Sequence, residues 1–244
     1  MLRAAGIGPG DEVVVPSFGD IGLAGEVVAV GAAPVFADID PSSYCLDADS
    51  VAAMVSSRTV AVVVVHRFGR SADLGPLRQL GRRHGLLVLE EDDEDTSPDA
   101  SGADRVDGQE LDELEQVRLR RAHAVYFDSR LRGVRTPPHG DGHTYRSYVV
   151  RVPGNGRPDR DAFARALRAR GVECAVPVRT PVHRMPGFRR GVLLPETERA
   201  AAETLALPMA ASLTRRQVRR VVAACNALGG PLRAEPGFRM AAAF

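Results

Sequence analysis

Polar side chains that could carry chemistry follow three apolar runs of the sequence. Ser17 to Asp20 comes after the first run, His66 and Arg67 after the second, and Glu90 to Asp92 at the end of the third. A histidine exchanges protons near neutral pH, an arginine holds a phosphate or a carboxylate, and a carboxylate can serve as a base. If the runs are parallel strands, their carboxyl ends meet at the edge where α/β folds bind ligands. We therefore expect any small-molecule site to lie at that edge.

Carboxylates dominate the residues around the end of the third run. The segment from Glu90 to Glu115 contains 13 Asp or Glu and a single Arg. Clustered carboxylates can bind Mg²⁺ or Ca²⁺, but this run lacks the alternating Asp spacing of a calcium loop. The residues Glu90 to Asp95 therefore predict a solvated acidic face and no metal site. Asp20, if it lies near Glu91, could instead form a carboxylate pair for acid–base chemistry.

The sequence contains no lysine, because all 32 residues that make up the Lys and Arg total are arginine. A GC-rich coding bias, which favours Arg, Ala, Gly and Pro, is the simplest explanation. The chemical consequence does not depend on the cause. Without a side-chain amine, this sequence cannot form a Schiff base at a lysine, and a lysine-bearing phosphate loop is excluded as well.

Composition excludes further classes of protein. The net charge is +1, so no overall field points to nucleic acid. Arg215, Arg216, Arg219 and Arg220 predict a solvated helix face, with nucleic-acid binding as the weaker alternative. The three scattered cysteines suit a reducing cytosol rather than a disulfide framework or a zinc module. No apolar run approaches the roughly 20 residues of a membrane helix. We expect a cytoplasmic protein that binds neither membrane nor nucleic acid.

Two kinds of pattern divide the chain. Residues 1–91 alternate strands and helices, which predicts a mostly parallel α/β sheet. The expected strands are Asp11–Val15, Pro34–Asp40, Val60–His66 and Leu86–Leu89, and the expected helices are Ile21–Val30, Asp49–Val55 and Leu74–His84. Residues 92–110 read as an acidic loop, solvated or disordered over about 92–108. Residues 111–132 are a connecting helix, residues 133–228 a small α+β domain, and residues 229–244 a frayed tail.

The elements expected after the acidic loop are less regular. The connecting helix shows apolar spacing at Leu111, Leu114, Val117 and Val125. The further expected strands are Thr144–Val152 and Val172–Val178, and the further expected helices are Asp159–Arg170, Glu196–Leu205 and Thr214–Leu228. Thr214 with Gln217 three residues later forms the pattern of a capping box, so the last helix is expected to begin there.

Blocks of the sequence, in order, resemble one known family. They are Gly6–Phe18, Gly31–Pro41, Val65–Asp73, Arg83–Glu90, His143–Val150, Val182–Pro186, Leu194–Glu198 and Leu205–Met209. Together they are similar to the DegT/DnrJ/EryC1/StrS family of sugar aminotransferases and related dehydratases, which depend on pyridoxal phosphate (PLP) and have fold type I. Each block alone is weakly specific, whereas their order and spacing over about 1–90 and 110–228 are strongly so.

The resemblance implies a fold, a cofactor, a ligand and partners. The fold would be a remnant of a fold-type I PLP-transferase large domain followed by a small α+β C-terminal domain. The family cofactor is PLP, the family ligand is a nucleotide-linked sugar, often in secondary metabolism, and family active sites form at a homodimer interface. Cofactor-binding remnants would be Ser17, Asp20, Glu91, Asp92 and Glu94, and substrate-binding candidates would be His66, Arg67, Arg179 and His183.

Departures from the family pattern decide the expected mechanism. The chain starts where the first large-domain helix of the family would end, so we expect the Gly-Thr phosphate-binding turn to be absent. Only residues 92–110 stand where family members carry a Ser and the Schiff-base Lys, or the His of the dehydratases. The aromatic that stacks on the cofactor ring falls at Asp20. The acid that contacts the pyridine nitrogen falls at Glu91, or at Asp92 if the register slips, and the following Gln becomes Glu94.

The resemblance and its departures together predict a degenerate family member without transaminase activity. Clustered acids repel a phosphate dianion, so we expect no covalently bound PLP. For the degenerate family member we expect a homodimer. One alternative is a non-catalytic accessory subunit that forms a heterodimer with a full-length family member. Another is a repurposed, PLP-independent enzyme that uses carboxylates. A decayed gene product is the remaining alternative.

Overall fold

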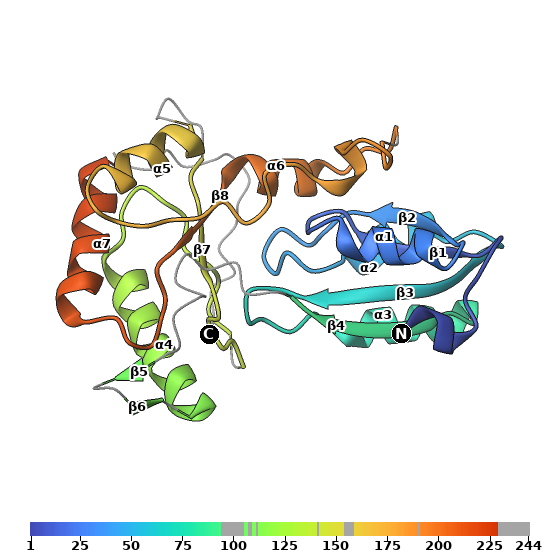
Figure 1. The fold of residues 1–244 in the computed structure, drawn as a ribbon, viewed down its shortest axis with the longest axis horizontal. Coiled ribbons are helices and arrows are strands. Elements are labelled where there is room, and N and C mark those ends of the chain that lie inside the picture. The colour runs from blue at the N-terminus through green and yellow to red at the C-terminus, as the bar shows by residue number, and fades with distance from the viewer. Residues whose placement is uncertain are drawn as a thin grey trace, which may run out of the picture.

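The computed structural model describes residues 1–93, 105–106, 109–110, 112–140, 142–153, 159–189 and 191–228. The predicted tail 229–244, most of the predicted acidic loop, and Glu94 and Leu111 lie outside the described residues. In Figure 1 a four-stranded sheet with its helices stands on one side, and α4, α5 and α7 surround a two-stranded sheet on the other. Helix α6 lies between these two parts (Figure 1).

The N-terminal half is a parallel sheet in the order β2-β1-β3-β4. The strands are β1 (Glu12–Pro16), β2 (Ala33–Ala37), β3 (Thr59–His66) and β4 (Leu87–Asp92). Val13, Val14 and Val15 of β1 are fully buried, and so are Val63 and Val64 of β3. Continuous β-branched runs suit strands that helices cover on both faces. Because all the pairings are parallel, the strands' carboxyl ends meet at one edge.

Four short helical elements accompany this sheet. They are η1 (Leu2–Ala5), α1 (Gly22–Ala29), α2 (Ala48–Met54) and α3 (Leu74–His84). Local side-chain caps begin two of them: Asp47 accepts from Ser50 N before α2, and Asp73 accepts from Gly75 N before α3. Gly85 ends α3 in the left-handed conformation, which is common for a glycine C-cap. The strands and helices expected in this half are therefore present, with ends shifted by a few residues.

The C-terminal half packs four helices around a small antiparallel sheet. Its elements are α4 (Glu113–Arg130), β7 (Tyr148–Arg151), α5 (Arg160–Arg168), η2 (Val182–Arg184), α6 (Pro195–Glu203), β8 (Thr204–Leu207) and α7 (Arg215–Leu228). Strands β7 and β8 pair antiparallel from Tyr148 opposite Leu207 to Arg151 opposite Thr204. Thr214 and Gln217 bond each other reciprocally at the start of α7, so the predicted capping box is present.

Several predictions for this half were wrong. The strand expected over Thr144–Val152 is only β7, because Tyr145 has φ 49 and turns the chain. The segment Val172–Val178 forms no regular strand, and only Ala175 bridges to Ala206. The helix expected to reach Leu205 ends at Glu203, because the next residues form β8.

The connecting helix and the acidic loop also differ from expectation. Helix α4 buries Ala124 and Phe127, whereas the predicted inward positions Leu114 and Val125 are 84% and 61% exposed. Strand β4 continues through the acidic residues to Asp92. Within the predicted loop, β5 (Arg105–Val106) and β6 (Gln109–Glu110) pair antiparallel. The apolar spacing at the start of α4 therefore does not mark its buried face.

An apolar cluster joins the two halves. Its buried members are Phe18, Ile39, Tyr44, Phe68, Val149, Val178, Ala200, Ala201 and Ala206. Phe18 and Tyr44 stack with ring centroids 5.6 Å apart, and Phe68 contacts both rings edge-on. This contact fixes the carboxyl edge of the sheet against β7, β8 and α6. The division into the predicted domain ranges stays a prediction.

Candidate functional site

A pocket of about 210 Å³ opens at the carboxyl edge of the sheet, where the sequence places the site. It is lined by Pro16, Gly19, Asp20, Gly22, Leu23, Glu26, Val65, Arg67, Glu91, Asp92 and Asp93. These residues come from the ends of β1, β3 and β4 and from the first turns of α1. Five carboxylates and one arginine therefore face the same small space.

The arginine of this pocket is already neutralised by the chain itself. Arg67 Nη1 lies 2.5 Å from Asp93 Oδ1, and Nη2 donates to the carbonyl of Phe18. Gly19 leaves the space that this side chain fills, because a Cβ there would lie 2.1 Å from Nη2. A buried guanidinium held by a carboxylate and a carbonyl offers little net charge to an incoming anion.

The carboxylates of the pocket repel one another. Burial raises the pKa of Glu91 above its ordinary value, and the negative charges of Glu26 and Asp20 raise it further. Asp20 is held in place because its Oδ1 accepts the N–H of Gly22 at the start of α1. Asp20 therefore occupies, with its own carboxylate, a helix N-terminus that could otherwise receive an anion. The structure thus brings Asp20 and Glu91 together, as the carboxylate-pair hypothesis requires.

PLP does not fit the residues of this pocket. Its phosphate needs several uncommitted donors, whereas the one arginine is paired and the helix N-terminus is capped by Asp20. Three further carboxylates, those of Glu26, Glu91 and Asp92, face the space that a dianion would enter, at a cost of about 1 kcal/mol for each like-charge pair in water and more near protein. Glu91 offers a carboxylate for a pyridine nitrogen, but the sequence has no lysine amine.

Other residues predicted for the site lie outside this pocket. His66 Nδ1 accepts the backbone N–H of Ala72, and its Nε2 lies 3.5 Å from Glu90 Oε2, so the ring belongs to the opposite face of β3. Arg179 is exposed on the loop before η2. Glu94 lies outside the described residues. Of the substrate-binding candidates, only Arg67 lines the pocket, and the roles proposed for all of them stay predictions.

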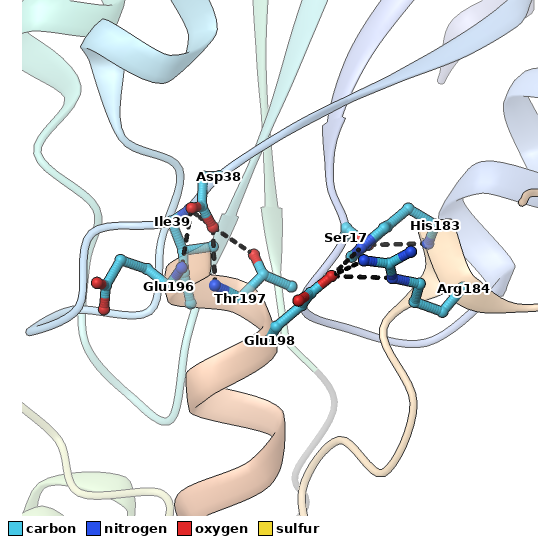
Figure 2. A network of polar contacts seen from close by, with 8 residues as sticks. All are labelled: Ser17, Asp38, Ile39, His183, Arg184, Glu196, Thr197 and Glu198. Carbon is cyan, nitrogen blue, oxygen red and sulfur yellow. Dashed lines mark hydrogen bonds and ion pairs between the residues drawn. The ribbon is translucent and has the colours of Figure 1, made fainter. Parts of the chain in front are cut away.

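Ser17 and His183 form a buried polar network (Figure 2). Ser17 Oγ lies 2.6 Å from His183 Nδ1 and also accepts the backbone N–H of His183 at 2.9 Å. His183 Nε2 lies 3.2 Å from Glu198 Oε1, which Arg184 also contacts. The order serine, histidine, carboxylate matches that of a nucleophilic triad. Both Ser17 and His183 are completely buried, so this network ties β1 to η2 and α6 rather than facing a substrate.

A second long-range contact, also in Figure 2, begins helix α6. Asp38, which follows β2, accepts the backbone N–H groups of Glu196 and Thr197 at 3.0 and 2.8 Å and the Thr197 hydroxyl at 2.7 Å. The residue at the N-cap position, Leu194, makes no side-chain cap. The sequence shows Pro195 at the helix start but gives no signal that the cap comes from 158 positions upstream.

Sequence reasoning also missed a larger hollow of about 550 Å³ on the C-terminal half. Arg121, Val125, His139, Gly140, Gly142 and Tyr145 line it. Its residues come from α4 and from the irregular segment before β7, and no spacing rule connects these two stretches. A group of three or more metal-binding side chains suited to hold an ion was not found in the described part of the chain. Within the same residues, each helix is too short or too polar to cross a bilayer.

Comparisons with known proteins place these features in context. The profile of the DegT/DnrJ/EryC1/StrS aminotransferase family matches residues 1–109 and 106–226. A "Pleiotropic regulatory protein" of Geobacillus stearothermophilus is 29% identical over 300 residues, which cover 91% of this chain and 79% of that protein. An L-glutamine:2-deoxy-scyllo-inosose aminotransferase of Streptomyces kanamyceticus is 47% identical over 90 residues, 37% of this chain and 21% of that enzyme. The match to GDP-perosamine synthase of Caulobacter vibrioides has the same identity and spans 24% of that enzyme.

Solved structures agree with the family profile on the fold. The aminotransferase TlmJ from Streptoalloteichus hindustanus superimposes with a TM-score of 0.78 at 28% identity, over 93% of this chain and 81% of TlmJ. The predicted fold class, a fold-type I α/β architecture, is confirmed. The two parts of the profile match meet at residues 106–109 of this chain.

Proposed function

Because this chain belongs to the DegT/DnrJ/EryC1/StrS aminotransferase family, we propose that it binds a nucleotide-linked sugar without carrying out PLP-dependent transamination. The observation that carries the second part is the pocket at the carboxyl edge of the sheet. Its arginine is paired with Asp93, its helix N-terminus is capped by Asp20, and its other carboxylates repel a phosphate. The sequence adds that no side-chain amine is present to hold a carbonyl cofactor.

The ligand class comes from the relatives. One matched relative is a GDP-perosamine synthase and another a UDP-N-acetyl-3-dehydro-alpha-D-glucosamine 3-aminotransferase, and both names contain a nucleoside diphosphate. Each is matched over 90 residues, 24% of its own length. The ligand class is therefore a proposal for this chain, and so is the loss of amino transfer.

The test of transamination uses the absence of lysine. The protein is incubated with PLP, reduced with borohydride, and mapped by peptide mass spectrometry. We expect no reduced adduct on an internal residue, and labelling of the N-terminal amine serves as the positive control for the chemistry. A stable internal adduct, or transfer of an amino group from glutamine or glutamate to a ketosugar nucleotide, would overturn this part of the proposal.

The test of ligand binding is calorimetry with UDP- and dTDP-sugars. We expect measurable binding at millimolar ligand, weakened when Arg67 is changed to Ala if the sheet-edge pocket takes part. His66 is the other substrate-binding candidate that the sequence places at this edge, so His66→Ala is compared beside it. Absence of heat with every sugar nucleotide would remove the ligand from the proposal and favour an accessory role.

A non-catalytic accessory subunit is the second candidate, and the edge strand β4 favours it. Among the described residues, β4 pairs only with β3, so its outer edge carries unpaired backbone groups. Leu87 at the start of this strand is 45% exposed. An exposed strand edge with an apolar side chain is suited to pair with another chain. Co-expression with a full-length family member, followed by size-exclusion chromatography, tests whether the two form a complex.

A further inference from the structure

A third pocket, of about 230 Å³, lies between the end of α5, the segment after β8 and the first turns of α7. It shares no lining residue with the pocket at the sheet edge or with the hollow beside α4. Helices α5 and α7 lie on the side of the molecule away from the four-stranded sheet (Figure 1). Sites for drug-sized ligands occupy about 300–1,000 Å³, so this pocket suits a smaller molecule.

The floor of this pocket is aliphatic. It is formed by Val172, Pro208, Leu213 and Val221. Val172 and Val221 are only 2% and 3% exposed, because they also belong to the C-terminal core. The turn that ends α5 holds Val172 in place: its N–H donates to the carbonyl of Leu167 at 3.1 Å, and Gly171 adopts the left-handed conformation. A branched aliphatic group on this floor is removed from water, which favours its binding.

Two hydrogen-bond donors stand on the α7 side of the rim. Gln217 and Arg220 are three residues apart on α7, so their side chains are neighbours on one face of the helix. Gln217 Oε1 accepts the N–H and the hydroxyl of Thr214 at 2.8 and 2.7 Å, which leaves its Nε2 amide as the donor. Among the described residues, neither this amide nor the Arg220 guanidinium has a hydrogen-bond or ion-pair partner. Together they suit one carboxylate.

One carboxylate completes the rim on the α5 side. Glu173 follows Val172 directly and is exposed. It too has no ion-pair or hydrogen-bond partner within the part of the chain that the structure describes. The rim therefore carries one unpaired charge of each sign above an aliphatic floor. A simple anion would be repelled by Glu173 and a simple cation by Arg220, so the matching ligand carries both charges and an apolar group.

We propose that this pocket binds a free α-amino acid with a branched aliphatic side chain. Arg220 and the Gln217 amide receive the carboxylate, Glu173 receives the ammonium group, and the side chain covers Val172 and Val221. A polar side chain such as that of glutamine would place an amide on the aliphatic floor without a partner, which disfavours it. The inference does not rest on the proposed function, because these residues are separate from the sheet edge.

The test is calorimetry on the full chain with L-leucine, L-leucinamide, N-acetyl-L-leucine and glycine. We expect L-leucine to bind the unmodified protein at millimolar concentration. Each of the other three compounds lacks one feature of the proposed ligand: the carboxylate, the ammonium group or the aliphatic side chain. Each should bind at least tenfold more weakly than L-leucine, which is about 1.4 kcal/mol, and L-glutamine should be as weak.

Substitutions on the rim test the roles of the two charges. Arg220→Gln and Glu173→Gln should each weaken L-leucine binding at least tenfold. Arg219→Gln is the matched control, because Arg219 is exposed next to Arg220 on α7 but does not line the pocket. It should bind L-leucine as the unmodified protein does. All three side chains are exposed, so the unfolding midpoint, measured alongside, should stay unchanged.

Four results would overturn the inference: no L-leucine binding to the unmodified protein, equally strong binding of glycine, unchanged binding in Arg220→Gln, or an equal loss in Arg219→Gln. Loss of L-leucine binding in Arg67→Ala but not in Arg220→Gln would place the amino acid at the sheet edge and remove this site. The calorimetry with sugar nucleotides is independent of these results, so the proposed function and this inference can fail separately.

Discussion

Replacing Asp38 by Ala should cost far more stability than removing an ordinary helix cap. The Asp38 carboxylate accepts four hydrogen bonds, from the N–H groups of Ile39, Glu196 and Thr197 and from the Thr197 hydroxyl. The side chain is 9% exposed, so water replaces these bonds poorly. Loss of an N-cap costs about 1 kcal/mol, and leaving buried donors without an acceptor adds about 1–3 kcal/mol. We therefore expect Asp38→Ala to lower the free energy of unfolding by about 3 kcal/mol.

A matched control separates the long-range role of this carboxylate from capping itself. Asp47 caps α2 locally, through a 2.7 Å bond from Ser50 N, and is only half-buried. Asp47→Ala should cost about 1 kcal/mol, and Asp38→Asn, which keeps one acceptor oxygen, a similar amount. Equilibrium urea unfolding of the three variants measures the differences. The reasoning is refuted if Asp38→Ala costs no more than Asp47→Ala, because the bonds to α6 would then contribute nothing beyond a local cap.

Three further predictions concern the buried polar groups. Ser17→Ala should lower the free energy of unfolding by about 1–3 kcal/mol, because it leaves the buried Nδ1 and backbone N–H of His183 without the Ser17 hydroxyl. Exposed Ser129→Ala should cost under about 0.5 kcal/mol, and equal losses in the two variants would contradict a structural network. Folding lowers the pKa of His143 from 6.5 to about 4, so the unfolded chain binds more protons than the folded protein between these pH values. The free energy of unfolding should therefore fall as the pH drops from about 6.5 to about 4, by up to about 3 kcal/mol. Urea unfolding at several pH values should show this slope in the unmodified protein and in His84→Gln but not in His143→Gln. Glu91→Gln should raise the thermal midpoint at pH 7, because the raised pKa of Glu91 means that folding penalises its charged form. The substitution should have no effect below the ordinary glutamate pKa of 4.5. A lower midpoint at pH 7 would show that Glu91 has a favourable partner.

The chain belongs to the family by its sequence and fold, and its pocket at the carboxyl edge of the sheet is lined by acids. The fold retains the parallel strands whose carboxyl ends form a ligand edge, and the profile match covers both halves. At that edge the chain supplies Asp20, Glu26 and Glu91, which favour cationic over anionic occupants. The positive charge lies instead around Arg70 and Arg121, next to the loop that follows β3.

Sequence alone determined the N-terminal half and the position of the candidate site. Valine runs such as Val60–Val65, local caps such as Asp73, and the Gly85 stop are short-range signals, because each acts within a few residues. They fix the strands, the helices and therefore the edge at which Asp20, Arg67 and Glu91 meet. The absence of lysine and the order of the family-like sequence blocks could also be found from the sequence, since neither depends on contacts in the folded protein.

Only the tertiary structure decided what those residues touch. Arg67 was open to substrate in the sequence, but the fold pairs it with Asp93. Ser17 and His183 are 166 positions apart, and Asp38 and Glu196 are 158 apart, so no local pattern could show that they form buried contacts. Strand β8 and the inward face of α4 depend on packing against β7 and the C-terminal core in the same way. The periodicity of apolar residues predicts which residues can be buried. The residues that cover them lie in segments distant along the chain, so the periodicity does not identify them.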